Sequence, residues 1–157
     1  MIRTATIQQD LQFTGGRVRR PMGDRAFARA VLDVEDWQLE TLLDAGKLGW
    51  VVDIASRGAE RRELRFVTAC LEEFKAGAVV ERTTSEIVQL IFGRGQRFVR
   101  ARWVYRCLNC KHGHFYDLMR ERVLPLAKGS EFRVGPGGSG VVEWSTLVRF
   151  FETRRVS

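Results

Sequence analysis

The sequence predicts an α+β, mainly helical fold in which one small unit is used twice. Shifting the chain by 76 positions places residues 32–74 on residues 108–150. Residues of similar class then coincide, such as Leu39 with Phe115 and Phe66 with Val142. A repeat of this size indicates a module present in two copies. The identical pairs are Leu32/Leu108, Leu42/Leu118, Leu48/Leu124, Arg57/Arg133, Leu71/Leu147 and Phe74/Phe150.

The repeat divides the chain into four expected segments. They are a basic N-terminal arm (1–23), a first repeat (24–77), a connector (78–96) and a second repeat (97–157). Apolar residues at odd positions between Ala5 and Phe13 allow a short hairpin in the arm. The connector contains a helical pattern from Ser85 to Phe92, and Gly93 is expected to end that helix.

The first repeat begins with two short helices. Asp24 is a plausible N-cap for a helix that reaches Leu32, and a second helix covers residues 35–45 with Gly46 just beyond its end. This pair has a helix-turn-helix outline. The pattern then predicts a strand over 50–54, a loop over 56–62, a returning strand at 64–66 and a helix from Thr68, acting as its cap, to Lys75.

The second repeat has the same order. We expect helices over 97–108 and 111–122, separated by a break at Asn109. A strand at 131–134, the loop GPGGSG at 135–140 and a returning strand at 141–143 should follow. Ser145 is then expected to cap the closing helix.

The positive charge lies mainly in the second repeat. The chain of 157 residues has a net charge of +7, to which the first repeat contributes −3 and the second +7. Only four of its 26 basic residues are lysines. The arginine guanidinium forms paired hydrogen bonds with phosphates and with the edge of guanine, so a polyanionic partner is indicated. A genome whose codons favour arginine would produce the same bias.

The remaining composition narrows the class of protein. The sequence has no run of eighteen apolar residues and no apolar core in its first sixteen residues, so neither a membrane span nor a secretory signal is expected. Three cysteines cannot all pair within one chain, which favours a reducing compartment. We therefore expect a cytoplasmic protein without a membrane partner.

Two segments of the sequence resemble a known family of DNA-binding modules. They are LETLLDAGKLGWVVDIASRGAERRELRFVTACLEEF (39–74) and FYDLMRERVLPLAKGSEFRVGPGGSGVVEWSTLVRFF (115–151). The order of a helix, a wing with basic and glycine residues, and a closing helix resembles the winged helix-turn-helix modules of the excisionase and MerR-like DNA-binding group. The resemblance implies two winged helix-turn-helix repeats joined by a helical connector. It also implies that the second helix of each repeat enters the major groove while the wing grips the backbone.

The expected DNA contacts follow from this arrangement, and they favour the second repeat. The second helix of the first repeat carries four carboxylates, which the phosphates would repel, so this repeat should contact DNA mainly through its wing or bind a protein instead. The candidate DNA-binding residues are Lys111, His112, His114, Tyr116, Arg120, Lys128 and Arg133 in the second repeat, and Gln38, Arg57, Arg61 and Arg62 in the first.

A cluster of Cys107, Cys110, His112 and His114 resembles a zinc site, but its ligands are too closely spaced to close a loop around the metal. Lys111 stands where a c-type haem motif needs histidine. We expect no metal and no cofactor. The two histidines have no serine nucleophile or carboxylate in a known catalytic order, so an enzyme is not expected.

The sequence thus predicts a sequence-specific double-stranded DNA-binding protein that acts by occluding or bending its site. It would be a transcriptional regulator or an excisionase-like recombination directionality factor, of phage or plasmid origin. The alternative is a protein-binding adaptor or inhibitor that uses the acidic helix and Trp37 against a host polymerase or recombinase. RNA binding is a weaker option, because the paired aromatic platform of common RNA modules is missing.

Overall fold

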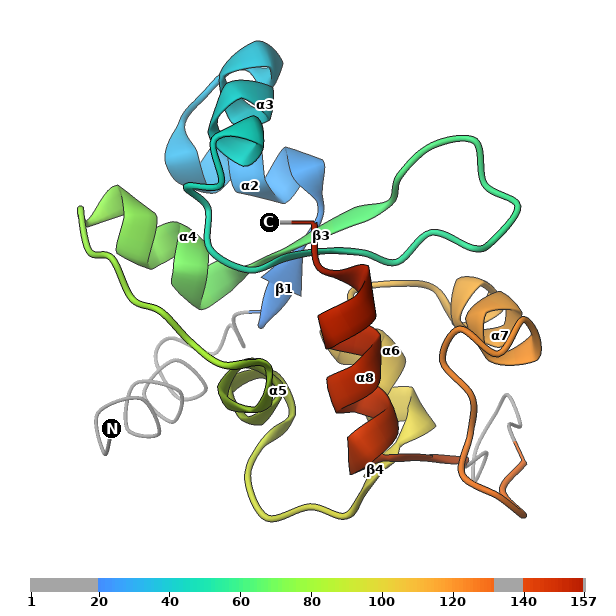
Figure 1. The fold of residues 1–157 in the computed structure, drawn as a ribbon. Coiled ribbons are helices and arrows are strands. Elements are labelled where there is room, and N and C mark those ends of the chain that lie inside the picture. Colours follow the sequence, from blue (N-terminus) through green and yellow to red (C-terminus); the bar gives the residue numbers. More distant parts are fainter. Residues whose placement is uncertain (1–19, 132–139, 157) are drawn as a thin grey trace.

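A computed structural model describes residues 20–131 and 140–156 and has an α+β fold with two small antiparallel sheets (Figure 1). The first half contains a three-stranded sheet of order β1-β3-β2. Its elements are β1 (Met22–Gly23), α2 (Arg25–Leu32), α3 (Asp36–Asp44), β2 (Val51–Asp53), β3 (Leu64–Val67) and α4 (Thr68–Lys75).

The second half contains a two-stranded sheet in which Val99 of β4 faces Val142 of β5. Helix α5 precedes this sheet in the chain and joins the two halves. The elements are α5 (Thr84–Phe92), β4 (Phe98–Arg100), α6 (Ala101–Cys107), α7 (His112–Arg120), β5 (Val141–Glu143) and α8 (Trp144–Arg154).

The backbone of the first half recurs in the second. Helices α3 and α7 have nine residues each and begin at equivalent positions of the repeat. Left-handed residues precede both helices, Asp33 with φ 54° and Asn109 with φ 52°, and follow both, Gly46 with φ 68° and Arg122 with φ 59°. The internal likeness of the sequence therefore extends to the order of these helices and to the positions of the turns beside them.

The core consists of two clusters on opposite faces of the three-stranded sheet. Side chains alternate along β2, so Val51 joins a smaller cluster with α2, α3 and α4, whereas Trp50 and Val52 join a larger cluster. The larger cluster also contains α5 and the apolar residues of the second half. Figure 1 shows this layering, with α2 and α3 on one side of β3 and with α6 and α8 on the other. Both expected repeats and the connector therefore contribute side chains to the larger cluster.

Several expected boundaries need correction. The sequence predicts a helix from residue 97, but residues 98–100 pair with β5 as strand β4 because the sheet hydrogen bonds compete with helix formation. The end of the expected N-terminal arm likewise forms strand β1 against β3. These strands have only two and three residues, which is too short for an alternating pattern to reveal.

The helix caps differ as well. Asp24 caps α2 as expected, because its Oδ1 accepts from the Phe27 amide at 2.9 Å. Helix α4 instead has Val67 at its N-cap, and the Thr68 hydroxyl donates to the Arg20 carbonyl at 2.6 Å. Helix α8 has Glu143 at its N-cap, not Ser145. The expected hairpin near residues 5–13 and most of the second wing, at 132–139, lie outside the described residues.

The last described residues return to the first half. The Val156 amide donates to the Val51 carbonyl at 2.8 Å, and Arg155 forms an isolated antiparallel bridge with Val52. The Arg155 guanidinium also lies 3.7 Å from the centre of the Trp50 ring. This segment therefore covers the free edge of β2.

A buried arginine links the central strand of the first sheet to the second half. Arg65 of β3 is only 6% exposed, and its guanidinium donates to the Leu108 carbonyl at 2.9 Å and to the Asn109 carbonyl at 3.0 Å. These carbonyls lie at the C-terminal end of α6. Carbonyl groups at this end of a helix lack donors within the helix and attract positive charge. A further contact to Glu63 at 3.0 Å gives Arg65 a carboxylate partner.

We expect Arg65→Ala to lower the free energy of unfolding by about 3 kcal/mol, because it leaves buried carbonyls without donors. Arg65→Lys should recover only part of this loss, since an ammonium group lacks the planar fork. Urea unfolding followed by circular dichroism measures the effect. Arg62→Ala, at an exposed position of the neighbouring loop, is the control and should change stability by less than about 0.5 kcal/mol. Equal losses in the Arg65 and Arg62 variants would contradict the link between the two halves.

Candidate nucleic-acid interface

Helix α7 presents a row of polar side chains to solvent. His112, Tyr116 and Arg120 are exposed and follow one another every fourth residue, which places them along one stripe of the helix. Phe115 and Leu118 on the opposite face are fully buried and fix the helix against the larger cluster. The buried face therefore determines which side chains α7 offers to a partner.

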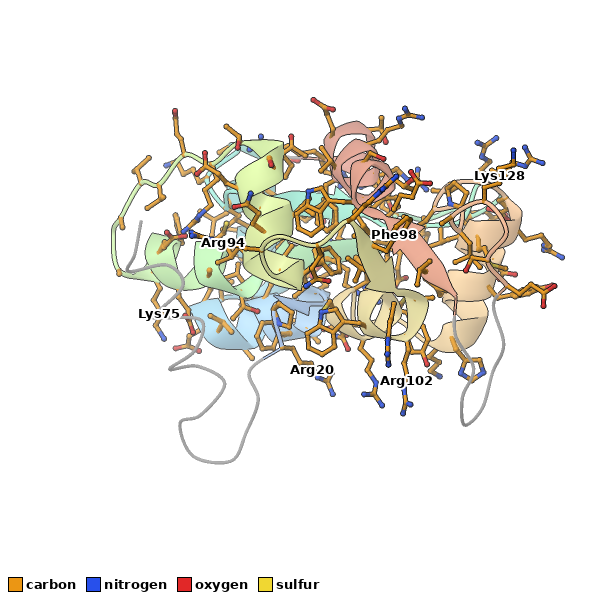
Figure 2. All side chains as sticks on the ribbon, turned by 90° about the horizontal axis from the view of Figure 1, so that it is seen from below. Arg20, Lys75, Arg94, Phe98, Arg102 and Lys128 are labelled. Atoms are coloured by element: carbon orange, nitrogen blue, oxygen red, sulfur yellow. The ribbon has the colours of Figure 1, made fainter. Side chains whose placement is uncertain are left out.

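A second row runs along α6. Arg102 and Arg106 are exposed and one helical turn apart. Beyond the end of this helix, Arg20 Nη1 donates to Asn109 Oδ1 at 2.9 Å, which adds a third guanidinium near the turn between α6 and α7. In Figure 2, Arg20 and Arg102 extend from the same lower edge of the molecule. The exposed Trp103 lies beside this row.

We call these two rows the α6–α7 surface. It consists of Arg20, Arg102, Trp103, Arg106, Lys111, His112, Tyr116 and Arg120. Four of these residues are not among the sequence candidates: Arg20, Arg102, Trp103 and Arg106. The spacing of Arg102 and Arg106 could have revealed the α6 row, whereas the position of Arg20 depends on its contact with Asn109, far away in the sequence.

The equivalent positions of the first half have a different charge. The repeat offset pairs Arg102 and Arg106 with Ala26 and Ala30 of α2. Four positions at or near α3 are acidic, and their equivalents at or near α7 are basic or aromatic. The equivalent residues are Glu35/Lys111, Asp36/His112, Glu40/Tyr116 and Asp44/Arg120. The two halves thus carry different charges at equivalent positions of the sequence repeat.

Arginines of α2 partly neutralise the acidic helix α3. Arg25 bridges Asp36, at 2.6 Å, and Glu40, while Arg29 lies 3.7 Å from Glu35. The hydrogen bond from Arg25 lowers the pKa of Asp36, so this carboxylate stays charged to lower pH than usual. Trp37 lies on the same helix with 69% of its surface exposed. The α3 surface is therefore a partly neutralised, still acidic network beside an exposed indole.

Two sequence candidates make internal contacts. His114 is half-buried and its Nε2 donates to the Ile54 carbonyl at 2.5 Å, so it lies between the two halves and outside the exposed row. Gln38 accepts from the Glu35 amide at 2.7 Å, within a capping box at the start of α3. Both side chains therefore have a structural role.

The loop between β2 and β3 brings the wing arginines near α7. Arg57, Arg61 and Arg62 are all exposed or half-exposed on this loop. The Arg57 amide donates to Glu121 Oε2 at 2.8 Å, which places the loop at the C-terminal end of α7. Figure 1 shows the loop passing near this helix. Lys128 lies at the opposite edge of Figure 2 from Arg102, and Arg133 lies outside the described residues.

The cysteine and histidine side chains do not converge. Cys107 is buried and its thiol donates to the Ile91 carbonyl at 3.7 Å, while His114 is bonded to Ile54. Burial raises the pKa of both Cys107 and Cys110 to about 12. Within residues 20–131 and 140–156, no group of three or more His, Cys, Asp or Glu side chains is placed to hold a metal ion.

Comparison of the chain with protein-family models, curated protein sequences and solved structures finds no match. Among the described helices, none has the length and apolar character that crossing a bilayer requires. The function must therefore be inferred from the residues of the α6–α7 surface and their surroundings.

We expect Cys107 and Cys110 to react very slowly with a thiol reagent such as DTNB at pH 8. A thiol of pKa about 12 is ionised in only about one molecule in ten thousand at that pH, and the thiolate is the reacting form. Burial raises the pKa of Cys70 as well. All three thiols should react at once in urea, which serves as the control. Fast modification of Cys107 in the folded protein would contradict the burial of this thiol.

Proposed function

We propose that this protein binds double-stranded DNA through the α6–α7 surface and acts as a transcriptional regulator or recombination directionality factor. The observation that carries the proposal is the change of charge between equivalent positions of the two halves. Three arginines, a lysine and a histidine line α6, α7 and their turn, where the first half has alanines and carboxylates. The change concerns these exposed positions and not every charge, because α2 keeps Arg25 and Arg29, and Asp117 of α7 lies 3.6 Å from Arg120.

Each helix has a part in the proposed mechanism. The resemblance to winged helix-turn-helix modules assigns the second helix, α7, to the major groove, which is wide enough to admit an α-helix. Arg120, His112 and Tyr116 could then reach base edges, while Arg102, Arg106 and Arg20 neutralise phosphates. The loop that carries Arg57, Arg61 and Arg62 lies beside the end of α7 and would contact the adjoining backbone.

We propose only one reader helix on this chain. On α3, Asp36, Glu40 and Asp44 occupy the positions of the α7 row, and phosphates would repel them. The first half instead contributes to the surface of the second half. Arg20 contacts Asn109, Arg65 contacts the turn after α6, and the loop between β2 and β3 contacts Glu121. Its role in DNA binding would be to position α7 and widen the footprint.

We expect Arg106→Gln to weaken DNA binding and to reduce the slope of log affinity against log salt by about 0.9, the contribution of one neutralised phosphate. Arg120→Ala should weaken binding to a selected site more than binding to random duplex, because a base contact is lost. Fluorescence anisotropy with labelled duplexes, over a range of salt concentrations, measures both effects.

Two variants serve as controls for this titration. Arg94→Gln removes an exposed arginine that lies away from Arg20 and Arg102 in Figure 2, and Glu40→Gln alters the acidic helix. Neither should lower affinity by more than about twofold. The proposal is wrong if Arg94→Gln and Arg106→Gln reduce binding equally, because the attraction would then depend on net charge alone.

A second candidate function is docking onto another protein through α3. It is favoured by Trp37, a large aromatic side chain with 69% exposure next to Asp36 and Glu40. Exposed aromatics of this kind often anchor protein interfaces. Selection of bound fragments from a random duplex pool separates the two functions: a defined consensus supports DNA readout, and failure to retain any duplex supports the adaptor.

A further inference from the structure

A small basic pocket lies at the junction of the two halves, apart from the α6–α7 surface. Its volume is about 290 Å³. The first half contributes Arg57 from the loop after β2, and the second contributes the turn after α7 and one side of α8. The lining residues are Arg57, Arg122, Val123, Pro125, Thr146, Arg149, Phe150, Thr153 and Arg154.

Four arginines share this pocket without a carboxylate in its lining. For Arg122 and Arg149, no ion pair is found within the described parts of the chain. Glu121 accepts from the Arg57 backbone amide, and no ion pair to the Arg57 guanidinium is found among the described residues. Arg57, Arg122 and Arg149 are exposed, so solvent screens part of their mutual repulsion, and an anion between them would still be attracted to all of these groups.

Arg154 has an unsatisfied donor at this site. One of its terminal nitrogens donates to the Ala55 carbonyl, which holds the side chain across the junction. Its Nε atom is buried and has no hydrogen-bond partner among the described residues. The Nε of Arg29 on α2 is buried and unpartnered in the same way, so an anion in the pocket is expected to contact the exposed guanidinium groups of the lining and not this atom.

The backbone at Arg122 provides an independent observation. Arg122 has φ 59°, and the equivalent residue of the first half is Gly46 with φ 68°. Glycine adopts this conformation without strain, whereas an L-residue with a long side chain does not. The second half thus places an arginine of the pocket at a position where the first half has glycine.

We propose that this pocket binds a phosphate group. A guanidinium can donate two parallel hydrogen bonds to two oxygens of one phosphate. The Thr146 hydroxyl in the lining can donate as well. The volume suits a single phosphate or a small phosphorylated molecule and lies at the lower end of ligand-pocket sizes. The phosphate comes either from the DNA backbone, in which case the inference rests on the proposed function, or from a free phosphorylated ligand.

The first experiment measures the thermal midpoint in sodium phosphate and in sodium chloride at equal ionic strength. The full chain should melt at a higher temperature in phosphate, and Arg149→Gln should lose most of this difference. Arg122→Gly provides a variant that folds without backbone strain at this position, so it should also lose the difference while melting no lower than the parent in chloride. Arg94→Gln is the matched control and should keep the full difference.

The second experiment identifies the source of the phosphate. If Arg149→Gln reduces the salt slope of DNA binding by about 0.9, the pocket receives a backbone phosphate. If the slope stays the same but the variant loses its stabilisation by inorganic phosphate, the ligand is a free phosphorylated molecule. That stabilisation can be measured even if the protein binds no DNA, so failure of the proposed function would not hide it.

The inference is overturned if phosphate and chloride give the same midpoint for the parent chain and Arg149→Gln leaves the DNA salt slope unchanged. It is also overturned if Arg94→Gln loses the phosphate effect to the same extent as Arg149→Gln and Arg122→Gly. In that case phosphate would act on the surface charge as a whole and not on this pocket.

Discussion

The guanidinium of Arg65 joins the two halves where α6 ends, and the position of α7 depends on it. A buried charge is costly unless all its hydrogen bonds are made, and Arg65 donates to Leu108, Asn109, Leu64 and Glu63. The contact holds the left-handed turn at Asn109, from which α7 starts. Arg20 holds the side chain of the same residue. The first half thereby determines the direction in which the second presents its exposed row.

The two halves share the order of their helices and the positions of several turns, but they pack differently. The first has its own small cluster under α2, α3 and α4, and the other face of its sheet packs against the second half. Its outer helix α3 is covered by an ionic network with Arg25 and Arg29. The second half completes its interior with α5 and with residues such as Trp50 and Val52. One half thus packs under the other, whose outer helices α6 and α7 keep their polar side chains exposed to solvent.

The sequence predicts those features of the fold that depend on residues close together in the chain. The Asp24 cap, the bounds of α3 and α7 to within two residues, and the buried faces formed by Leu39 and Phe115 follow from helical spacing. Contacts between distant residues could not be predicted. Strands β1 and β4 exist because β3 and β5 lie beside them, and His114 turns inward because Ile54 offers a carbonyl. The spacing of Arg102 and Arg106 shows that they share one side of a helix, but packing partners decide which side of that helix is exposed.

The return of Val156 to β2 affects how the chain can fold during synthesis. Strand β2 lies at the edge of its sheet, and the segment that covers it leaves the ribosome long after the rest of that sheet. Until then the nascent first half has open backbone donors and acceptors that can pair with a neighbouring polypeptide. Closure by Arg155 and Val156 therefore acts as a late safeguard against aggregation, and extensions fused after these residues would have to leave the bridge to Val52 intact.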